Sequence, residues 1–358
     1  MTPDAGLRDL LALGDLDGLV READRRAAAE DWDGVVALRD ACLAATAETG
    51  RQLWGPARYA AYRVALDGPA PLAAAMLEVG VSRHGLGPLT EVVAQHHHFA
   101  DLAERLDGPL RSVVAQERVL RGEDLRADPR AEPSDPEAPP LRLEPFEPAY
   151  VLPTYRATER VDGAPVLTAG ADVPIPAAGA TGSVKASPPL ARAVADALHE
   201  AVATWESASD ARVRTIALGE STAADAVRAV APDARMARTL GLPDLLALIA
   251  FAGASGGVHG ARRGGAAGRA AAWWVARTAV GLTAPGVPLD VDELEFRLED
   301  LELVAFATPG PAAWRLQVAV ADPATGAAAA VSAVEPPVGH PHGARGDQDR
   351  GDDPGVRP

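Results

Sequence analysis

Four Gly-Pro pairs divide the first 125 residues into short segments, and this spacing constrains the fold more than any other feature. The pairs begin at Gly55, Gly68, Gly87 and Gly108. Proline suits the first turn of a helix because it lacks the N–H that the turn leaves unpaired. Apolar residues recur at helical spacing between the pairs. Because connections this short favour antiparallel neighbours, we expect residues 1–125 to form an all-helical array.

This array consists of several helices rather than one long one. No repeat of fixed period is found, so a true helical repeat stays a hypothesis. Apolar residues at helical spacing starting at Leu7, Leu16 and Val35 predict the first three helices. The pattern predicts further helices over residues 56–66, 71–79, 88–97, 99–106 and 110–121.

Residues 126–149 differ from what precedes them in composition. They hold seven prolines and six acidic residues with few apolar side chains. Such a stretch buries too little surface to fold alone, so we expect an extended linker. Residues 335–358 are mostly Gly, Pro, Asp and Arg, which predicts a disordered tail.

Between the linker and the tail, residues 150–334 mix strand and helix patterns. An Asp162-Gly163 turn signal predicts a hairpin of strands 150–157 and 164–168. A second hairpin, with Gly326 in its turn, is expected from the alternation in 314–320 and 327–334. The remaining expected elements are helices 189–206, 243–253 and 266–281, a strand over 212–218, and 293–306, which fits either type.

A helix is also expected to begin after Thr222, because Thr222 and Asp225 have the spacing of a capping box. It should reach about Val230. The chain as a whole is therefore predicted to be α+β: an all-α array followed by a mixed domain with a C-terminal β-hairpin.

Composition excludes several functional classes. The formal net charge is −16, which argues against general nucleic-acid binding, since a basic face supplies that affinity. No apolar run is long enough to span a membrane. Cys42 is the single cysteine, so no intrachain disulfide can form and a reducing compartment is the default. We expect a soluble cytoplasmic protein, and no residue pattern identifies a cofactor.

The most distinctive candidate site is the Gly-rich stretch 253–269. Residues 251–285 contain four arginines and no acidic residue. Free backbone amides, a helix N-terminus and guanidinium donors together suit a phosphate, nucleotide or carboxylate. The alternative is a mobile loop whose small residues let two helices pack closely. The candidate ligand-binding residues are Ser255, Gly256, Gly257, Arg262, Arg263 and Arg269, with His259 as a possible acid–base group.

Ser221 is a second candidate, because Gly219-Glu-Ser-Thr-Ala223 approximates the G-x-S-x-G nucleophile elbow between a strand and a helix. A serine hydrolase would also need an acid and a histidine, for which Asp244 and His259 are available. Helix capping by Ser221 or Thr222 explains the same residues without catalysis.

Three weaker patterns complete the candidates. His97 and Asp101 stand at i,i+4 and form the best metal-ligand pair near the triple histidine, although the ligand set is incomplete. Lys185 follows glycines but lacks the neighbours of a phosphate-binding P-loop. Arg269, Trp273 and Arg277 share one helix face, which predicts cation–π stacking and leaves Trp274 for the core.

Three functions follow from these patterns. The first is a binding or scaffold protein that engages a protein partner through residues 1–125, since helical arrays present extended surfaces. The second is an enzyme or ligand-binding protein with an anion site in residues 253–269. The third is a serine hydrolase at Ser221.

Overall fold

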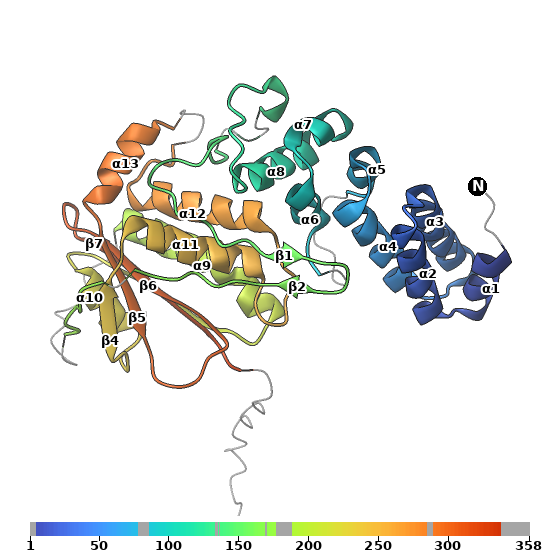
Figure 1. Cartoon of the computed structure of the whole chain (residues 1–358). Helices are drawn as coiled ribbons and strands as arrows, with labels where there is room; N and C mark the ends of the chain where they lie inside the picture. The colour runs from blue at the N-terminus through green and yellow to red at the C-terminus, as the bar shows by residue number, and fades with distance from the viewer. Residues whose placement is uncertain are drawn as a thin grey trace, which may run out of the picture.

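The computed structural model of the chain confirms the α+β class, with an α-helical half preceding a half built on an antiparallel sheet (Figure 1). It describes residues 5–77, 86–132, 135, 137–168, 170–176, 188–284 and 289–337. Lys185 and the tail from 338 onward lie outside the described residues. No helix within these ranges is both long and apolar enough to cross a membrane.

The helical half is a succession of short helices, as predicted. Aspartates cap several of them: Asp15 and Asp31, for example, accept hydrogen bonds from Gly18 N and Gly34 N. The helices are α1 (Ala5–Leu13), α2 (Leu16–Ala28), α3 (Trp32–Thr49), α4 (Trp54–Asp67), α5 (Ala70–Ala75), α6 (Leu89–His96), α7 (Phe99–Leu102), the 3-10 helix η1 (Ala103–Arg105) and α8 (Gly108–Val119).

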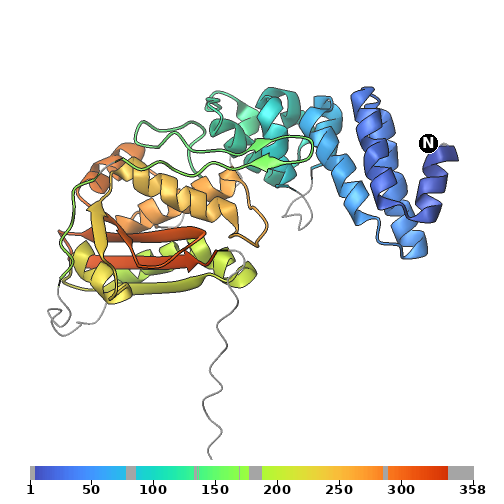
Figure 2. The same ribbon diagram turned by 60° about the horizontal axis from the view of Figure 1, so that its bottom comes forward.

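Two apolar clusters hold this half together. One joins α1 to α4 around Leu19, Leu38 and Val64, and the other joins α5 to α8 around Phe99, Leu102 and Val114. The first cluster lies at the end of the molecule farthest from the sheet (Figures 1 and 2). The described helices therefore extend away from the second half as an elongated arm.

Residues 126–149, hereafter the strap, have little regular structure beyond the short 3-10 helix η2 (Pro129–Ala131). The strap nevertheless buries side chains toward its C-terminal end. Leu141 and Leu143 pack against the α5–α8 cluster, while Phe146 belongs to the core of the second half. The strap therefore packs against both halves, because its few apolar residues contact the two cores.

The predicted first hairpin forms with a different turn. Strands β1 (Thr154–Tyr155) and β2 (Arg160–Val161) pair around residues 156–159, so the Asp162-Gly163 turn is wrong. Residues 164–168 form no strand. The hairpin is held by α6, since Gln95 Oε1 accepts from Tyr155 N at 2.7 Å and Gln95 Nε2 donates to Tyr155 O at 3.0 Å.

The main sheet has the order β3-β7-β6-β5-β4, with every neighbouring pair antiparallel. Its strands are β3 (Arg212–Leu218), β4 (Met236–Thr239), β5 (Glu302–Ala307), β6 (Trp314–Asp322) and β7 (Ala327–Glu335). Gly326 has φ +67° in the β6–β7 turn, as predicted. Strand β4 was not predicted, and β7 continues to Glu335, which the sequence assigned to the tail.

Helices cover both faces of this sheet. On one face lie α9 (Pro189–Ala208), α11 (Leu242–Ser255), α12 (Gly265–Ala279) and α13 (Val291–Glu299). The other face carries α10 (Ala223–Val230), which has the predicted Thr222–Asp225 capping box. Strand β6 serves both layers by alternation: Leu316, Val318 and Val320 face the first, and Ala319 and Ala321 the second.

Candidate functional site

The Gly-rich stretch forms the junction loop, residues 256–264, between α11 and α12. Gly256 ends α11 in the left-handed region, with φ +72°. A Cβ at Gly268 would lie 2.2 Å from Ala250 O, and a Cβ at Gly253 would lie 3.3 Å from Gly268 Cα. These small residues therefore let α11 and α12 cross closely, which was the alternative interpretation of the stretch.

Arg262 leaves the junction loop toward the helical half and meets Glu91 of α6. Its Nε and Nη2 each lie 2.7 Å from a Glu91 carboxylate oxygen, in a bidentate pair. The Glu91 side chain is 0% exposed and that of Arg262 is 6% exposed. Glu91 also accepts hydrogen bonds from Gly265 N at 3.0 Å and Tyr155 Oη at 2.6 Å. One buried carboxylate thus joins α6, the β1 hairpin and the start of α12.

A second carboxylate, Glu117 of α8, lies on the same helix start. It accepts from Ala266 N at 2.8 Å and pairs with Arg121 Nη1 at 3.2 Å. Burial, followed by the negative charge of Glu91, raises the pKa of Glu117 to about 7. Burial alone would raise the pKa of Glu91 too, but the hydrogen bonds and charge of Arg262 outweigh it and lower that pKa. The two carboxyls therefore differ in protonation near neutral pH.

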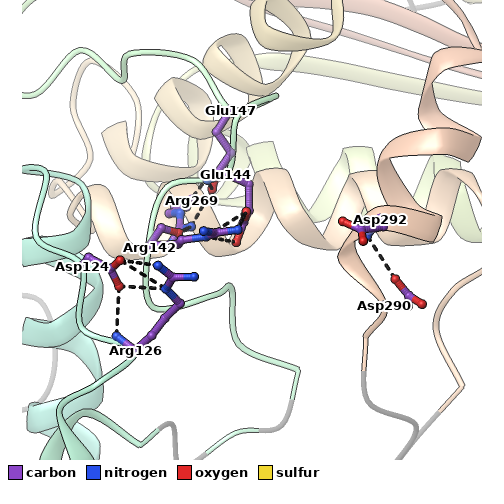
Figure 3. A network of polar contacts seen from close by, with 8 residues as sticks. All are labelled: Asp124, Arg126, Arg142, Glu144, Glu147, Arg269, Asp290 and Asp292. Carbon is purple, nitrogen blue, oxygen red and sulfur yellow. Dashed lines mark hydrogen bonds and ion pairs between the residues drawn. The ribbon is translucent and has the colours of Figure 1, made fainter.

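Arg269 of α12 binds the strap (Figure 3). Its Nε and Nη2 donate to Glu147 at 2.8 and 2.6 Å, and both side chains are 0% exposed. Its remaining donors reach Gln116 Oε1 at 2.6 Å, Pro140 O at 2.8 Å and Arg142 O at 2.7 Å. All five N–H groups of the guanidinium are used within the chain. The prediction that Arg269 binds an external anion is therefore wrong.

A fourth carboxylate, Glu335, binds the other end of the junction loop. Both of its oxygens lie 2.8 Å from Val258 N, and Ser209 Oγ donates to it. A Cβ at Gly257 would come within 2.9 Å of Ser209 Cβ, so the loop and α9 need a glycine there. Ser255 is buried and accepts from Trp205 Nε1 at 2.9 Å. Gly256 and Gly257 are buried as well.

The loop and the first turns of α12 thus receive negative charge from four glutamates of the chain itself. Sequence reasoning recognised the donors and missed the acceptors Glu91, Glu117, Glu147 and Glu335. Glu91 and Glu117 lie among apolar residues within predicted helices. This apolar sequence context could have indicated that the two carboxylates are buried. The partners that these four glutamates bind are 171, 149, 122 and 77 residues away in the sequence. No local sequence pattern could therefore predict which residues they contact.

Arg262 and Arg263 do not converge on one cavity. Arg262 borders a small closed space with Tyr150 and Leu152, whereas Arg263 lines an open groove on the opposite side of α12. We call this the junction groove. It has a volume of about 750 Å³ and lies among α8, α9, α12 and the strap residues Asp135 and 137–139. Arg263 makes no ion pair with any described residue.

Both tryptophans of α12 pack in or against the core of the second half. Trp273 is 2% exposed, belongs to the core and donates to Glu147 at 2.9 Å. Trp274 is partly buried and packs against the same core, as expected, and it also lines the junction groove. The predicted cation–π contact is confirmed for Arg269, 5.8 Å from the Trp273 ring centroid. Arg277 turns away and binds Glu137 O and Leu282 O.

Ser221 does not sit in a hydrolase arrangement. Its hydroxyl donates to Gly219 O at 3.0 Å. Ser221 follows the end of β3, while His259 lies near Ser209, before the start of that strand. The length of β3 separates them by about 20 Å. Asp244 instead accepts from Thr168 N at 3.0 Å. The structure therefore contradicts the serine hydrolase interpretation.

The histidine-rich segment at the end of α6 shows no metal cluster. Within the described ranges, no group of three His, Cys, Asp or Glu side chains could hold an ion. His98 pairs with Glu123 at 2.7 Å, and burial lowers the pKa of His97. His97 and Asp101 thus remain a pair without further ligands among these residues.

A second groove, the α3 groove, runs along the helical arm and has a volume of about 710 Å³. Its floor is small and apolar, and carboxylates stand around it. The floor residues are Leu11, Val36, Ala37, Ala41, Ala44 and Ala45, and the carboxylates are Asp33, Asp40 and Glu48.

The raised pKa of Glu117 predicts how stability depends on pH. The folded protein holds this proton more tightly than the unfolded chain, whose glutamate pKa is near 4.5. The resulting stability is complete below pH 4.5 and is lost as the pH rises through about 7. We expect the free energy of unfolding, relative to Glu117→Gln, to fall by roughly 3 kcal/mol across that window. Chemical denaturation at several pH values measures this slope.

The matched control is Glu104→Gln, because the Glu104 side chain is 82% exposed. This variant should keep the pH slope of the wild type. A Glu117→Gln protein with the wild-type slope between pH 5 and 8 would show that Glu117 is ionised throughout.

Comparison with known families places the chain. Residues 17–335 match the family described as "Family of unknown function (DUF6183)", so the chain belongs to this family. No curated protein matches the chain, and no solved structure matches it.

Proposed function

We propose that the protein is a binding protein whose helical half holds a basic amphipathic helix of a protein partner. The α3 groove carries this proposal, because it combines a floor of small apolar residues with surrounding carboxylates. It lies on the part of the arm farthest from the sheet (Figure 1). A helix laid in a groove buries an apolar stripe and leaves its charged flanks at the rim.

The shape of the groove suits a helix. Its α3 lining runs from Asp33 to Glu48, which corresponds to about 22 Å along the helix axis. Alanine at Ala37, Ala41 and Ala44 leaves room for a partner backbone to approach closely. The length corresponds to about four turns of a partner helix.

The charge of the groove selects a basic partner. Asp33 and Glu48 make no ion pair with any described residue, and Asp40 pairs only with the adjacent Arg39, at 2.9 Å. The net charge of −16 adds long-range attraction for a cationic segment. Lysine or arginine flanks would therefore meet free carboxylates, and binding should weaken as salt rises.

Fluorescence anisotropy tests the proposal directly. The probe is a fluorescein-labelled helical peptide with alanine and leucine on one face and lysines on both flanks. The matched probe replaces every lysine with glutamate. We expect the lysine peptide to bind and the glutamate peptide to fail. The charge reversal Asp33→Lys/Glu48→Lys should weaken binding about tenfold, or about 1.4 kcal/mol.

Tryptophan substitutions at two alanines of α3 test whether the peptide needs the open groove. Ala44 is exposed and lines it, whereas Ala47 is exposed on the same helix and does not. Ala44→Trp should block the peptide, and Ala47→Trp should leave binding unchanged. Equal binding of both peptides, or equal loss in both tryptophan variants, would overturn the proposal.

A further inference from the structure

The junction groove is separate from the α3 groove and has the size of a small-molecule site, which typically measures about 300–1,000 Å³. We propose that it binds a linear zwitterion: an apolar chain with an anionic group at one end and a cationic group at the other. The argument rests on where its free charges lie along α12.

Arg263 supplies the anion-binding end. It precedes α12, is partly exposed, and its guanidinium has no ion-pair partner among the described residues. The neighbouring arginines differ sharply, since Arg262 and Arg269 are saturated by Glu91 and Glu147. Arg263 is therefore the junction arginine that remains available for a carboxylate or phosphate.

The α12 side of the groove is apolar, while Thr90, Ser112 and Gln116 add polar groups elsewhere in its lining. Its α12 side consists of Ala266, Ala267, Ala270 and Ala271. Across from them α8 contributes Leu110 and Val113, and Val113 is 41% exposed. An apolar ligand chain would cover this surface and remove it from water.

The far end of the groove suits a cation. Trp274 and Glu137 both line the groove, and the backbone carbonyl of Glu137 binds Arg277 at the end of α12. Asp135 and Glu200 also line the groove, and the carboxylates of Glu137 and Glu200 make no ion pair with described residues. An ammonium group here would meet carboxylates and the face of an indole ring.

These charges exclude simpler ligands. A plain anion would satisfy Arg263 but would face three acidic side chains, and a plain cation would leave Arg263 without a partner. From the start of α12 to Trp274 the helix advances about 14 Å, which sets the separation of the two charges. A peptide fits less well than an alkyl chain along α12, because the alanine methyl groups on that side offer its amides no hydrogen bonds.

Isothermal titration calorimetry with the full chain tests the proposal. The probe is ω-aminodecanoate, compared with decanoate and decylamine, which each lack one charge, and with ω-aminohexanoate, which is too short. We expect ω-aminodecanoate to bind at least tenfold more tightly than the other three. A tetra-alanine peptide with free termini tests the alternative chain chemistry, and tighter binding of that peptide would overturn the proposal.

Variants of the lining residues test which end of the groove binds each charged group of the ligand. Arg263→Gln should reduce the affinity for ω-aminodecanoate to that for decylamine, and Glu137→Gln should reduce it toward that for decanoate. Ala270→Trp should remove binding of every probe by filling the floor, at an exposed position that leaves folding intact. Arg235→Gln, at an exposed arginine outside the groove, is the control. Equal affinity for all probes, or no effect of Arg263→Gln, would refute the proposed site.

Discussion

Replacing Arg269 with methionine should lower the free energy of unfolding by about 3–5 kcal/mol, the cost of removing one partner of a buried ion pair. The variant leaves the carboxylate of Glu147 in a fully buried position without its cation. It also leaves Gln116 Oε1 and the carbonyls of Pro140 and Arg142 without donors. Denaturant unfolding followed by circular dichroism measures this loss.

The matched control is Arg126→Met in the same strap (Figure 3). Arg126 pairs with Asp124 at 2.5 Å, but their side chains are 54% and 51% exposed. This exposed pair should contribute at most about 1 kcal/mol. Similar losses in the two variants would mean that burial does not determine the strength of these pairs.

Limited trypsin digestion gives a second measurement for Arg269. The strap contains Arg130 and Arg142, and α12 holds this segment through the Arg269 guanidinium. Loss of that guanidinium should speed cleavage within the strap before the rest of the chain unfolds. If Arg269→Met does not fold, Arg269→Lys keeps the charge and loses the bidentate geometry, so the same acceleration is expected in a folded protein.

Arg262→Met should cost a similar amount, about 3–5 kcal/mol, because it leaves Glu91 buried and without its cation. Glu91 would keep only the Tyr155 hydroxyl and Gly265 N as direct donors. Its pKa should then rise, so the loss should be smaller at low pH, where the carboxyl is protonated. Thermal and denaturant unfolding at two pH values would measure both effects.

A double-mutant cycle with Glu91→Gln separates the ion pair from the other contacts of each residue. Residues in direct contact should show a coupling energy of about 0.5–3 kcal/mol. Arg238→Met is the control, because Arg238 and Asp172 form an exposed pair, at 54% and 86% exposure. A coupling energy near zero for Glu91 and Arg262 would contradict the bidentate pair.

Both predictions concern the same physical feature, the attachment of the helical arm to the sheet half. Glu91 and Glu117 come from the arm, and both bind the first residues of α12. Glu147 comes from the strap and binds the middle of α12. The single helix α12 therefore holds α6, α8 and the strap through these three glutamates.

Much of the fold could be predicted because local physical chemistry decided it. Gly-Pro pairs and the helical spacing of apolar residues placed the short helices of the arm, and the Thr222–Asp225 spacing placed α10. Alternating side chains placed β3, β6 and β7 within a residue or two. The segment 293–306 fitted both periods because it contains both elements, α13 followed by β5.

Errors arose where local signals competed with distant contacts. The turn at Asp162-Gly163 was predicted from its residue types. In the structure the hairpin turns at residues 156–159, because Gln95 of α6 binds Tyr155 just before them. Strand β4 has four residues and three of them are exposed, so its alternation was too weak to recognise. Its pairing with β5 decides its conformation.

The sequence alone determined the class of the fold, the positions of most helices and the cationic character of the 253–269 stretch, because each depends on neighbouring residues. Only the tertiary structure decided which groups contact these arginines. The carboxylates that neutralise Arg262 and Arg269 lie more than a hundred residues away, so no local pattern could reveal them. Arg262 and Arg269 are structural because they are buried against distant glutamates. Arg263 instead lines an open groove on the opposite side of α12.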